Sequence, residues 1–282
     1  MTNGKAYAGC NAFVFAASGA IASAVSRELA RQGARVFLSG RDARRLEELA
    51  RAISAETGTE PDVATVDATS ASAVADYLDT LAARGVVPDW AFNGIGLDPV
   101  GAMYGERSES LPTEVFTLPL TAIVGGQFVT ATQSALRMRP YGRGTIVLVT
   151  ASLAKSAMPF MAGITAACDA VQGLARVLAA EYAPNGLRVL CVRVAGIPET
   201  RTIRLTSAAN ARTRGVTVQE FGRASGVGAA ASVLTLEAAA GKIVVLCAPG
   251  SAAPAGEPLD VDATSVEVDR SPSAAHANTR RG

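Results

Sequence analysis

The sequence is poor in histidine and lysine. Its 282 residues contain one histidine, His276, and three lysines, Lys5, Lys155 and Lys242. A single histidine near the end of the chain cannot activate a serine or cysteine nucleophile in the body of a domain, and it supplies no imidazole pair for zinc. A hydrolase of the serine–histidine type and a histidine-ligated zinc enzyme are therefore excluded.

Cysteine is also scarce and has no pairing pattern. Cys10, Cys168, Cys191 and Cys247 are scattered, without a C-x-x-C pair. Isolated cysteines of this kind behave as small hydrophobic residues, so we expect all four to be buried. The sequence predicts no metal site.

An excess of charge is lacking as well. The chain has 26 basic and 25 acidic residues, a formal net charge of +1, and 49% hydrophobic residues. This balance gives no electrostatic reason to bind nucleic acid or an anionic membrane. There is no basic-then-apolar leader and no uninterrupted apolar run of about 18 residues. We therefore expect a soluble cytoplasmic protein with no nucleic-acid partner and no membrane partner.

Short apolar runs of strand character alternate with segments of helical periodicity. This alternation is typical of an α/β fold with a doubly wound parallel sheet. The expected strands lie near 11–16, 34–39, 62–66, 88–92, 144–150 and 187–194. We expect one domain over 1–262 and a mobile polar tail over 263–282. Residues 94–120 are expected to form a loop, and 196–232 an irregular lid over a pocket.

The segment 13–42, FVFAASGAIASAVSRELARQGARVFLSGRD, follows the order strand, turn, helix, strand. In dinucleotide-binding proteins such a turn is rich in glycine, and the free N–H groups of the following helix bind the pyrophosphate. Here alanine stands where glycine is usual. Four further motifs each follow an expected strand: SGRD, VDATS, FNGIG and VAGIPET.

Together these motifs resemble the short-chain dehydrogenase/reductase family, and most closely its 3-oxoacyl-reductase-like branch, over residues 10–262. The resemblance implies a single Rossmann-like doubly wound sheet. The family turn T-G-x-x-x-G-x-G falls on residues 15–22, with Ala16, Ala20 and Ala22 at its three glycines. By the same resemblance the apolar run KIVVLC is expected to be helical, although its β-branched residues alone favour a strand.

The resemblance also implies nucleotide contacts, which we expect to be vestigial. They would come from Ser18, Ile21, Arg41, Asp67 and Asn93. An arginine at position 41, where NAD-specific members carry an acid, would suit the 2′-phosphate of NADP, or it is simply a solvated residue in a helix-entry loop. Because Ala16 and Ala20 place Cβ atoms in the phosphate path, we expect weak NADP binding and no required cofactor.

The catalytic residues implied by the resemblance are missing at their positions. The family uses a tyrosine as proton donor, a lysine that lowers its pKa, a serine and an asparagine. Their positions fall on Ile164, Cys168, Ala151 and Val124, with Ser152 next to the serine position. No tyrosine lies between 141 and 182, so a shifted alignment does not restore the donor. The ordinary ketoreductase mechanism therefore has no acid, and we expect no catalytic residue at the family positions.

The first functional hypothesis is a non-catalytic subunit. The long helices that pack family assemblies, here about 113–139 and 160–183, remain apolar, so a homo-oligomer or a hetero-oligomer with an active homologue is expected.

Two alternatives stay open. One is a redox-neutral enzyme, for example a cyclase, dehydratase or aldolase-like catalyst, which binds a small-molecule ligand in the old substrate pocket. Its candidate groups are Ser152, Cys168 and Asp169, together with loop residues Asp98, Tyr104 and Glu106. The other is a divergent NADP-dependent oxidoreductase that takes its proton from water or substrate.

Overall fold

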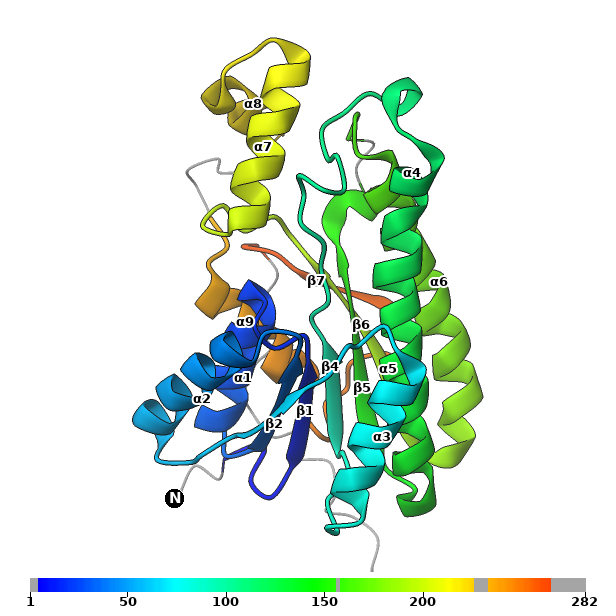
Figure 1. Cartoon of the computed structure of the whole chain (residues 1–282). Coiled ribbons are helices and arrows are strands. Elements are labelled where there is room, and N and C mark those ends of the chain that lie inside the picture. The colour runs from blue at the N-terminus through cyan, green and yellow to red at the C-terminus, as the bar shows by residue number, and fades with distance from the viewer. Residues whose placement is uncertain (1–4, 156–157, 226–232, 265–282) are drawn as a thin grey trace, which may run out of the picture.

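The computed structural model describes residues 5–155, 158–225 and 233–264. Seven parallel strands form one sheet in the order β3-β2-β1-β4-β5-β6-β7 (Figure 1). The doubly wound α/β fold predicted from the sequence is therefore confirmed. The strands are β1 Asn11–Phe15, β2 Arg35–Gly40, β3 Asp62–Thr65, β4 Trp90–Asn93, β5 Gly144–Ala151, β6 Leu187–Val194 and β7 Pro258–Val261.

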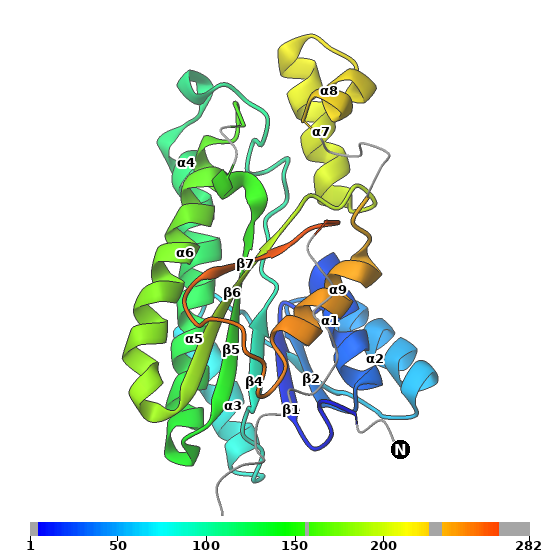
Figure 2. The same ribbon diagram turned by 180° about the vertical axis from the view of Figure 1, so that it is seen from behind.

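Helices cover both faces of this sheet. One layer contains α1, α2 and α9, and the other contains α3, α5 and α6; Figure 2 shows the same layers from behind. The helices are α1 Ala20–Arg31, α2 Ala43–Thr57, α3 Ala71–Ala82, α4 Thr113–Pro119, α5 Gly125–Met138, α6 Ala162–Tyr182, α7 Arg201–Arg214, α8 Val218–Ser225 and α9 Leu236–Leu246. Each layer encloses its own apolar core against the sheet.

Local sequence signals explain where several helices begin and end. The Asp42 side chain accepts a hydrogen bond from the backbone N–H of Arg45 at 3.1 Å and caps α2, which ends at Gly58 in the left-handed conformation. Ser70 caps α3 in the same way. Such caps satisfy backbone N–H groups that have no partner within the helix.

The expectation of a loop over 94–120 is wrong beyond residue 112. Helix α4 begins at Thr113, and the wider turn Leu120–Val124 joins it to α5. Pro119 lacks an N–H and ordinarily interrupts a helix. Here the wide turn that follows absorbs the disruption, and the chain stays helical.

The expectation of an irregular lid over 196–232 is also wrong for its described part. This segment forms α7 and α8, because Thr200 caps α7 at the N–H of Ile203 and Gly215, at φ 68°, ends it. Residues 226–232 and the tail from 265 onward lie outside the described residues. The run KIVVLC lies largely in α9, as the family resemblance implied.

One apolar helical stretch within the described ranges, Thr113–Tyr141, is long enough to cross a membrane by length and composition, and an 18-residue window within it has a mean hydropathy of 1.4. Its larger part, α5, packs against β4, β5 and α3. This stretch is therefore part of the helical layer that covers the sheet. The expected absence of a membrane partner stays a prediction.

Candidate functional site

The direction of chain winding reverses between β1 and β4, which lie side by side in the sheet. In open α/β sheets, ligands bind beyond the carboxyl ends of the strands at such a point. Here β1 leads into the alanine turn and β4 ends at Asn93. The candidate site therefore lies above these two strand ends.

The turn after β1 has the backbone of a glycine turn although alanine occupies it. Ala16 has φ 52°, in the left-handed region that favours glycine. The N–H of Ala17 donates to Ser39 O at 2.9 Å, and the N–H of Gly19 donates to Ala16 O at 3.1 Å. These bonds hold Ala16 in a conformation that costs an alanine about 1 kcal/mol.

The N-terminus of α1 is open. Gly19 precedes the helix and provides no side-chain hydrogen bond, and the first turn holds no acidic residue. The N–H groups of Ala20, Ile21 and Ala22 have no partner within the helix because they belong to its first turn. Such an end attracts phosphate through its N–H groups and through the helix dipole.

Ala22 does not face this space. It is buried, and a Cβ built on Gly94 would lie 2.5 Å from the Ala22 Cβ. Ala22 therefore fits because the chain after β4 has a glycine opposite it. Of the three alanines in the turn, only Ala16 and the exposed Ala20 can limit the approach of a phosphate.

Two charged residues follow the neighbouring strands β2 and β3. Arg41 is exposed directly after β2, and Asp67 is exposed after β3. Hydrogen bonds from the backbone and the hydroxyl of Thr69 hold the pKa of the Asp67 carboxyl below its usual range, with a smaller contribution from Arg41. Arg41 and Asp67 therefore lie near each other, as the family motifs implied.

Arg45 was missed by the sequence analysis. From the first turn of α2 its Nη2 reaches back to the Ser18 carbonyl oxygen at 2.9 Å. This bond joins the turn after β1 to the segment after β2. The available signal was its spacing of one helical turn from Arg41, which places both guanidinium groups near the same end of α2.

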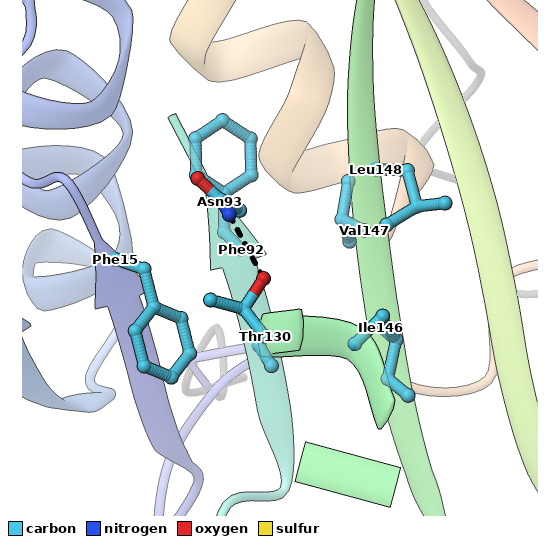
Figure 3. A pocket seen from close by; sticks show the side chains of 9 residues that line it. Phe15, Phe92, Asn93, Thr130, Ile146, Val147 and Leu148 are labelled. Atoms are coloured by element: carbon cyan, nitrogen blue, oxygen red, sulfur yellow. Dashed lines mark hydrogen bonds between the residues drawn. The ribbon is translucent and has the colours of Figure 1, made fainter. Parts of the chain in front are cut away.

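Asn93, the last residue of β4, is nearly fully buried and joins the strand end to α5 by hydrogen bonds. Its Nδ2 donates to Thr130 Oγ1 at 2.8 Å (Figure 3). The same nitrogen donates to Gly126 O at 2.9 Å, and the Oδ1 accepts from the N–H of Ile95 at 2.8 Å. The apolar gap beside it does not hold a water molecule. Asn93 thus fixes α5 and the strand end, and its effect on a ligand is indirect.

Cys168 lies on α6 against the end of β5. The Thr150 hydroxyl donates to the Cys168 carbonyl oxygen at 3.0 Å. Burial raises the pKa of the Cys168 thiol, and the lowering effect of nearby Ala151 and Thr150 does not offset it. The thiol is therefore protonated at neutral pH and is a poor nucleophile. All four cysteines are buried and free, as predicted.

The other polar candidates near α6 are not gathered into one site. Asp169 is exposed on α6, where its Oδ1 accepts from Gln172 Nε2 at 3.2 Å. Lys155 pairs with Asp260 on β7, which also binds Arg193.

The remaining predicted positions are Ala151, which is half-buried as the last residue of β5, Ser152, which is half-buried just after it, Ile164, which is buried on α6, and Val124, which is half-buried at the end of the wide turn. Within the described residues there is no group of three or more His, Cys, Asp or Glu side chains that could hold a metal.

Helix α7 is held against the segment that follows β4 by two ion pairs and a hydrogen bond. Arg201 pairs with Asp98 and Arg212 with Glu106, each at 2.6 Å. The Thr213 hydroxyl donates to the Gly105 carbonyl oxygen at 2.6 Å. These bonds bring the loop candidates Asp98 and Glu106 to α7, where both carboxylates are paired.

The comparisons agree with this architecture. A family model described as enoyl-(acyl carrier protein) reductase matches residues 15–263. The chain is 29% identical over 187 residues to gluconate 5-dehydrogenase of Gluconobacter oxydans, covering 64% of this chain and 68% of that protein. It is 26% identical over 215 residues to D-beta-hydroxybutyrate dehydrogenase of Rhizobium meliloti, covering 74% of this chain and 79% of that protein.

Solved structures show the same fold. NAD+-bound xylitol dehydrogenase has a TM-score of 0.82 at 21% identity, covering 91% of this chain and 99% of that one. Sorbitol-6-phosphate 2-dehydrogenase from Erwinia amylovora has a TM-score of 0.81 at 17% identity, covering 91% of this chain and all of that one. At these identities the likeness concerns the fold.

The hypothesis of a non-catalytic subunit is contradicted by these findings, because the relatives are named as active dehydrogenases. It rested on the side chains at family positions on α6, β5 and the wide turn. It gave no weight to protic groups that other segments bring to the same place. The redox-neutral alternative is not retained either. The family match over most of the chain, together with the relatives and the shared fold, shows that the chain belongs to the short-chain dehydrogenase/reductase family.

Proposed function

We propose that this protein is an NADP-dependent oxidoreductase that interconverts a small hydroxy compound and the corresponding carbonyl compound. The observation that carries the proposal is the turn after β1. Ala16 keeps the left-handed backbone of a dinucleotide turn, and the N-terminus of α1 behind it is uncapped. Backbone strain of this kind, held in place by the surrounding structure, clusters at ligand-binding and active sites.

The residues around the turn fit a dinucleotide. The first-turn N–H groups of α1 would hold the pyrophosphate, and Asp67 would lie beside the adenine. Arg41 and Arg45 would hold the 2′-phosphate, because two guanidinium groups near one turn favour an extra dianion. The earlier expectation of no required cofactor is therefore replaced, since a dehydrogenase needs an electron acceptor.

Bound there, the nicotinamide supplies or accepts the hydride. The chain must then position the substrate carbonyl above the ends of β4 and β5 and manage the proton on its oxygen. We propose that this proton does not pass through the family positions. Ile164 is an alkane side chain, and the Cys168 thiol is held protonated and buried.

The substrate is proposed to be a small hydroxy acid. Gluconate 5-dehydrogenase and D-beta-hydroxybutyrate dehydrogenase are both named for substrates of this class.

We also propose that the protein forms a homo-oligomer through α5 and α6. Phe128 and Leu136 on α5 are 49% and 52% exposed, and Val177 on α6 is 53% exposed. Apolar side chains that share adjacent helix faces are removed from water when a second copy packs on them.

Nucleotide titration tests the proposal. NADPH should bind. Arg41→Ala should weaken NADPH binding by about tenfold or more, because a charge-assisted contact to the 2′-phosphate contributes about 1.5–3 kcal/mol. The affinity for NADH should stay unchanged. Arg51→Ala, an exposed arginine further along α2, is the matched control and should leave both affinities unchanged. Failure of both nucleotides to bind would refute the proposal.

A further inference from the structure

The hydroxyl of Tyr104 is the unused protic group of the site. Three tyrosines, two of them buried and the third, Tyr77, half-buried, differ in what their hydroxyls do. That of Tyr7 donates to Val244 O at 2.7 Å, and that of Tyr77 is sealed in the core without a partner. The Tyr104 ring is buried, but its hydroxyl has no hydrogen-bond partner in the described part of the chain. Unlike the Tyr77 hydroxyl, it is not completely buried. It is therefore open to a ligand.

Tyr104 lies near the start of α6. Its side chain belongs to the same apolar cluster as Met161, Ile164 and Cys168, at the start of α6. It is close enough to Cys168 for a thiolate there to raise its pKa. Ile164 and Cys168 mark the helix face that the family turns toward the substrate. A phenol from the segment after β4 therefore belongs to the same apolar cluster as this helix face.

The backbone holds Tyr104 in place on two sides. Its N–H donates to Pro99 O at 3.0 Å, and the next N–H, of Gly105, donates to Phe160 O at 2.8 Å. Gly105 has φ 93°, and a Cβ there would lie 2.8 Å from the backbone nitrogen of Asn210 on α7. A group held between two packed segments keeps its position, as a proton donor must.

We propose that Tyr104 is the catalytic proton donor of this enzyme; the proposal rests on the oxidoreductase function above. In the reductive direction its Oη–H bond breaks, the proton goes to the substrate oxygen, and the electron pair stays on the phenolate. The carbonyl carbon receives its hydride from the reduced nicotinamide cofactor. Water then returns a proton to the phenolate, which closes the balance.

The surroundings of Tyr104 favour reduction. Burial and the neighbouring Cys168 raise its pKa, so the phenol is protonated throughout the neutral range. An alkoxide is more basic than a phenolate, so proton transfer from the Tyr104 phenol to the substrate oxygen is thermodynamically favourable. Glu106 on the same segment is paired with Arg212. Oxidation needs the phenolate, so its rate should rise with pH throughout the assay range.

The test compares Tyr104→Phe with Tyr77→Phe, which removes a buried hydroxyl elsewhere. Oxidation of gluconate and of D-beta-hydroxybutyrate with NADP+ is followed across pH, together with NADPH affinity and thermal unfolding. Tyr104→Phe should lower kcat by about 10²–10⁴-fold and abolish the rise with pH, with unchanged NADPH affinity and folding. Tyr77→Phe should behave as the wild type.

Each outcome separates this inference from the proposed function. If the wild type is active and Tyr104→Phe keeps its kcat within about threefold, Tyr104 is not the donor, although the oxidoreductase function stands. If the wild type oxidises neither compound, the proposed substrate class fails. The ultraviolet absorbance of tyrosine then tests whether the Tyr104 hydroxyl contacts the ligand. Adding either compound with NADP+ should shift this absorbance in the wild type and in Tyr77→Phe but not in Tyr104→Phe. The same response in all three proteins would overturn the inference.

Discussion

Replacing Ala16 with glycine should stabilise the protein, which is unusual for a change from alanine to glycine. At φ 52° the alanine side chain costs about 1–2 kcal/mol relative to an unstrained backbone. Glycine removes this strain but loses about 0.4–1 kcal/mol, because it frees the unfolded chain. The difference is a gain of up to about 1.6 kcal/mol, with a midpoint near about 0.8 kcal/mol, or roughly 2–3 °C in the unfolding temperature of a domain of this size.

Chemical denaturation of Ala16→Gly and Ala20→Gly measures this difference. Ala20 is the first residue of α1 and is exposed, so glycine there has no left-handed strain to relieve and should destabilise by up to about 1 kcal/mol. Opposite signs for the two variants are expected. Equal destabilisation would show that Ala16 is not in the left-handed conformation, and the argument for a preserved dinucleotide turn would fail.

Two further predictions concern packing and charge. Gly94→Ala should destabilise by about 1–3 kcal/mol through overpacking against Ala22, and adding Ala22→Gly should recover most of this loss in a double-mutant cycle; additive effects would contradict the contact. The hydrogen bond from Arg193, with a further one from Lys155, holds the pKa of the Asp260 carboxyl below its ordinary value. The ionised carboxylate therefore stabilises the fold at any pH above that ordinary pKa, and this stabilisation is lost as the pH falls through the lowered pKa. Asp260→Asn should therefore lower neutral-pH stability and flatten the acid side of a stability profile, and an unchanged profile would refute the linkage.

The order of the elements could be read from the sequence because it is written in local patterns. Buried parallel strands require continuous apolar runs, and the predicted strands near 144–150 and 187–194 coincide with β5 and β6. The run KIVVLC is the exception. Its β-branched residues favour a strand, yet α9 forms because it packs beside α1 and against β7, where a mostly apolar helix is buried.

The segments where a helix replaces an expected loop or lid contain signals that point both ways, and for 113–120 the expected loop overlapped the long helix expected over about 113–139. Pro119 and neighbouring glycines indicated a loop, but the wide turn Leu120–Val124 keeps α4 and α5 continuous. In α7 the Thr200 cap could have been recognised, but the helix is rich in polar residues. Its contacts with the segment after β4 stabilise it, and those contacts join residues about 100 positions apart.

The sequence by itself determined the fold class, the family motifs and the identity of the residues at each family position. Only the tertiary structure decided what those residues do. It set Ala22 against Gly94, brought Arg45 to the Ser18 carbonyl, buried the Cys168 thiol and packed Tyr104 into the same apolar cluster. Strand and helix patterns arise from neighbours along the chain, whereas a site is made by segments that meet only when the sheet and its layers have formed.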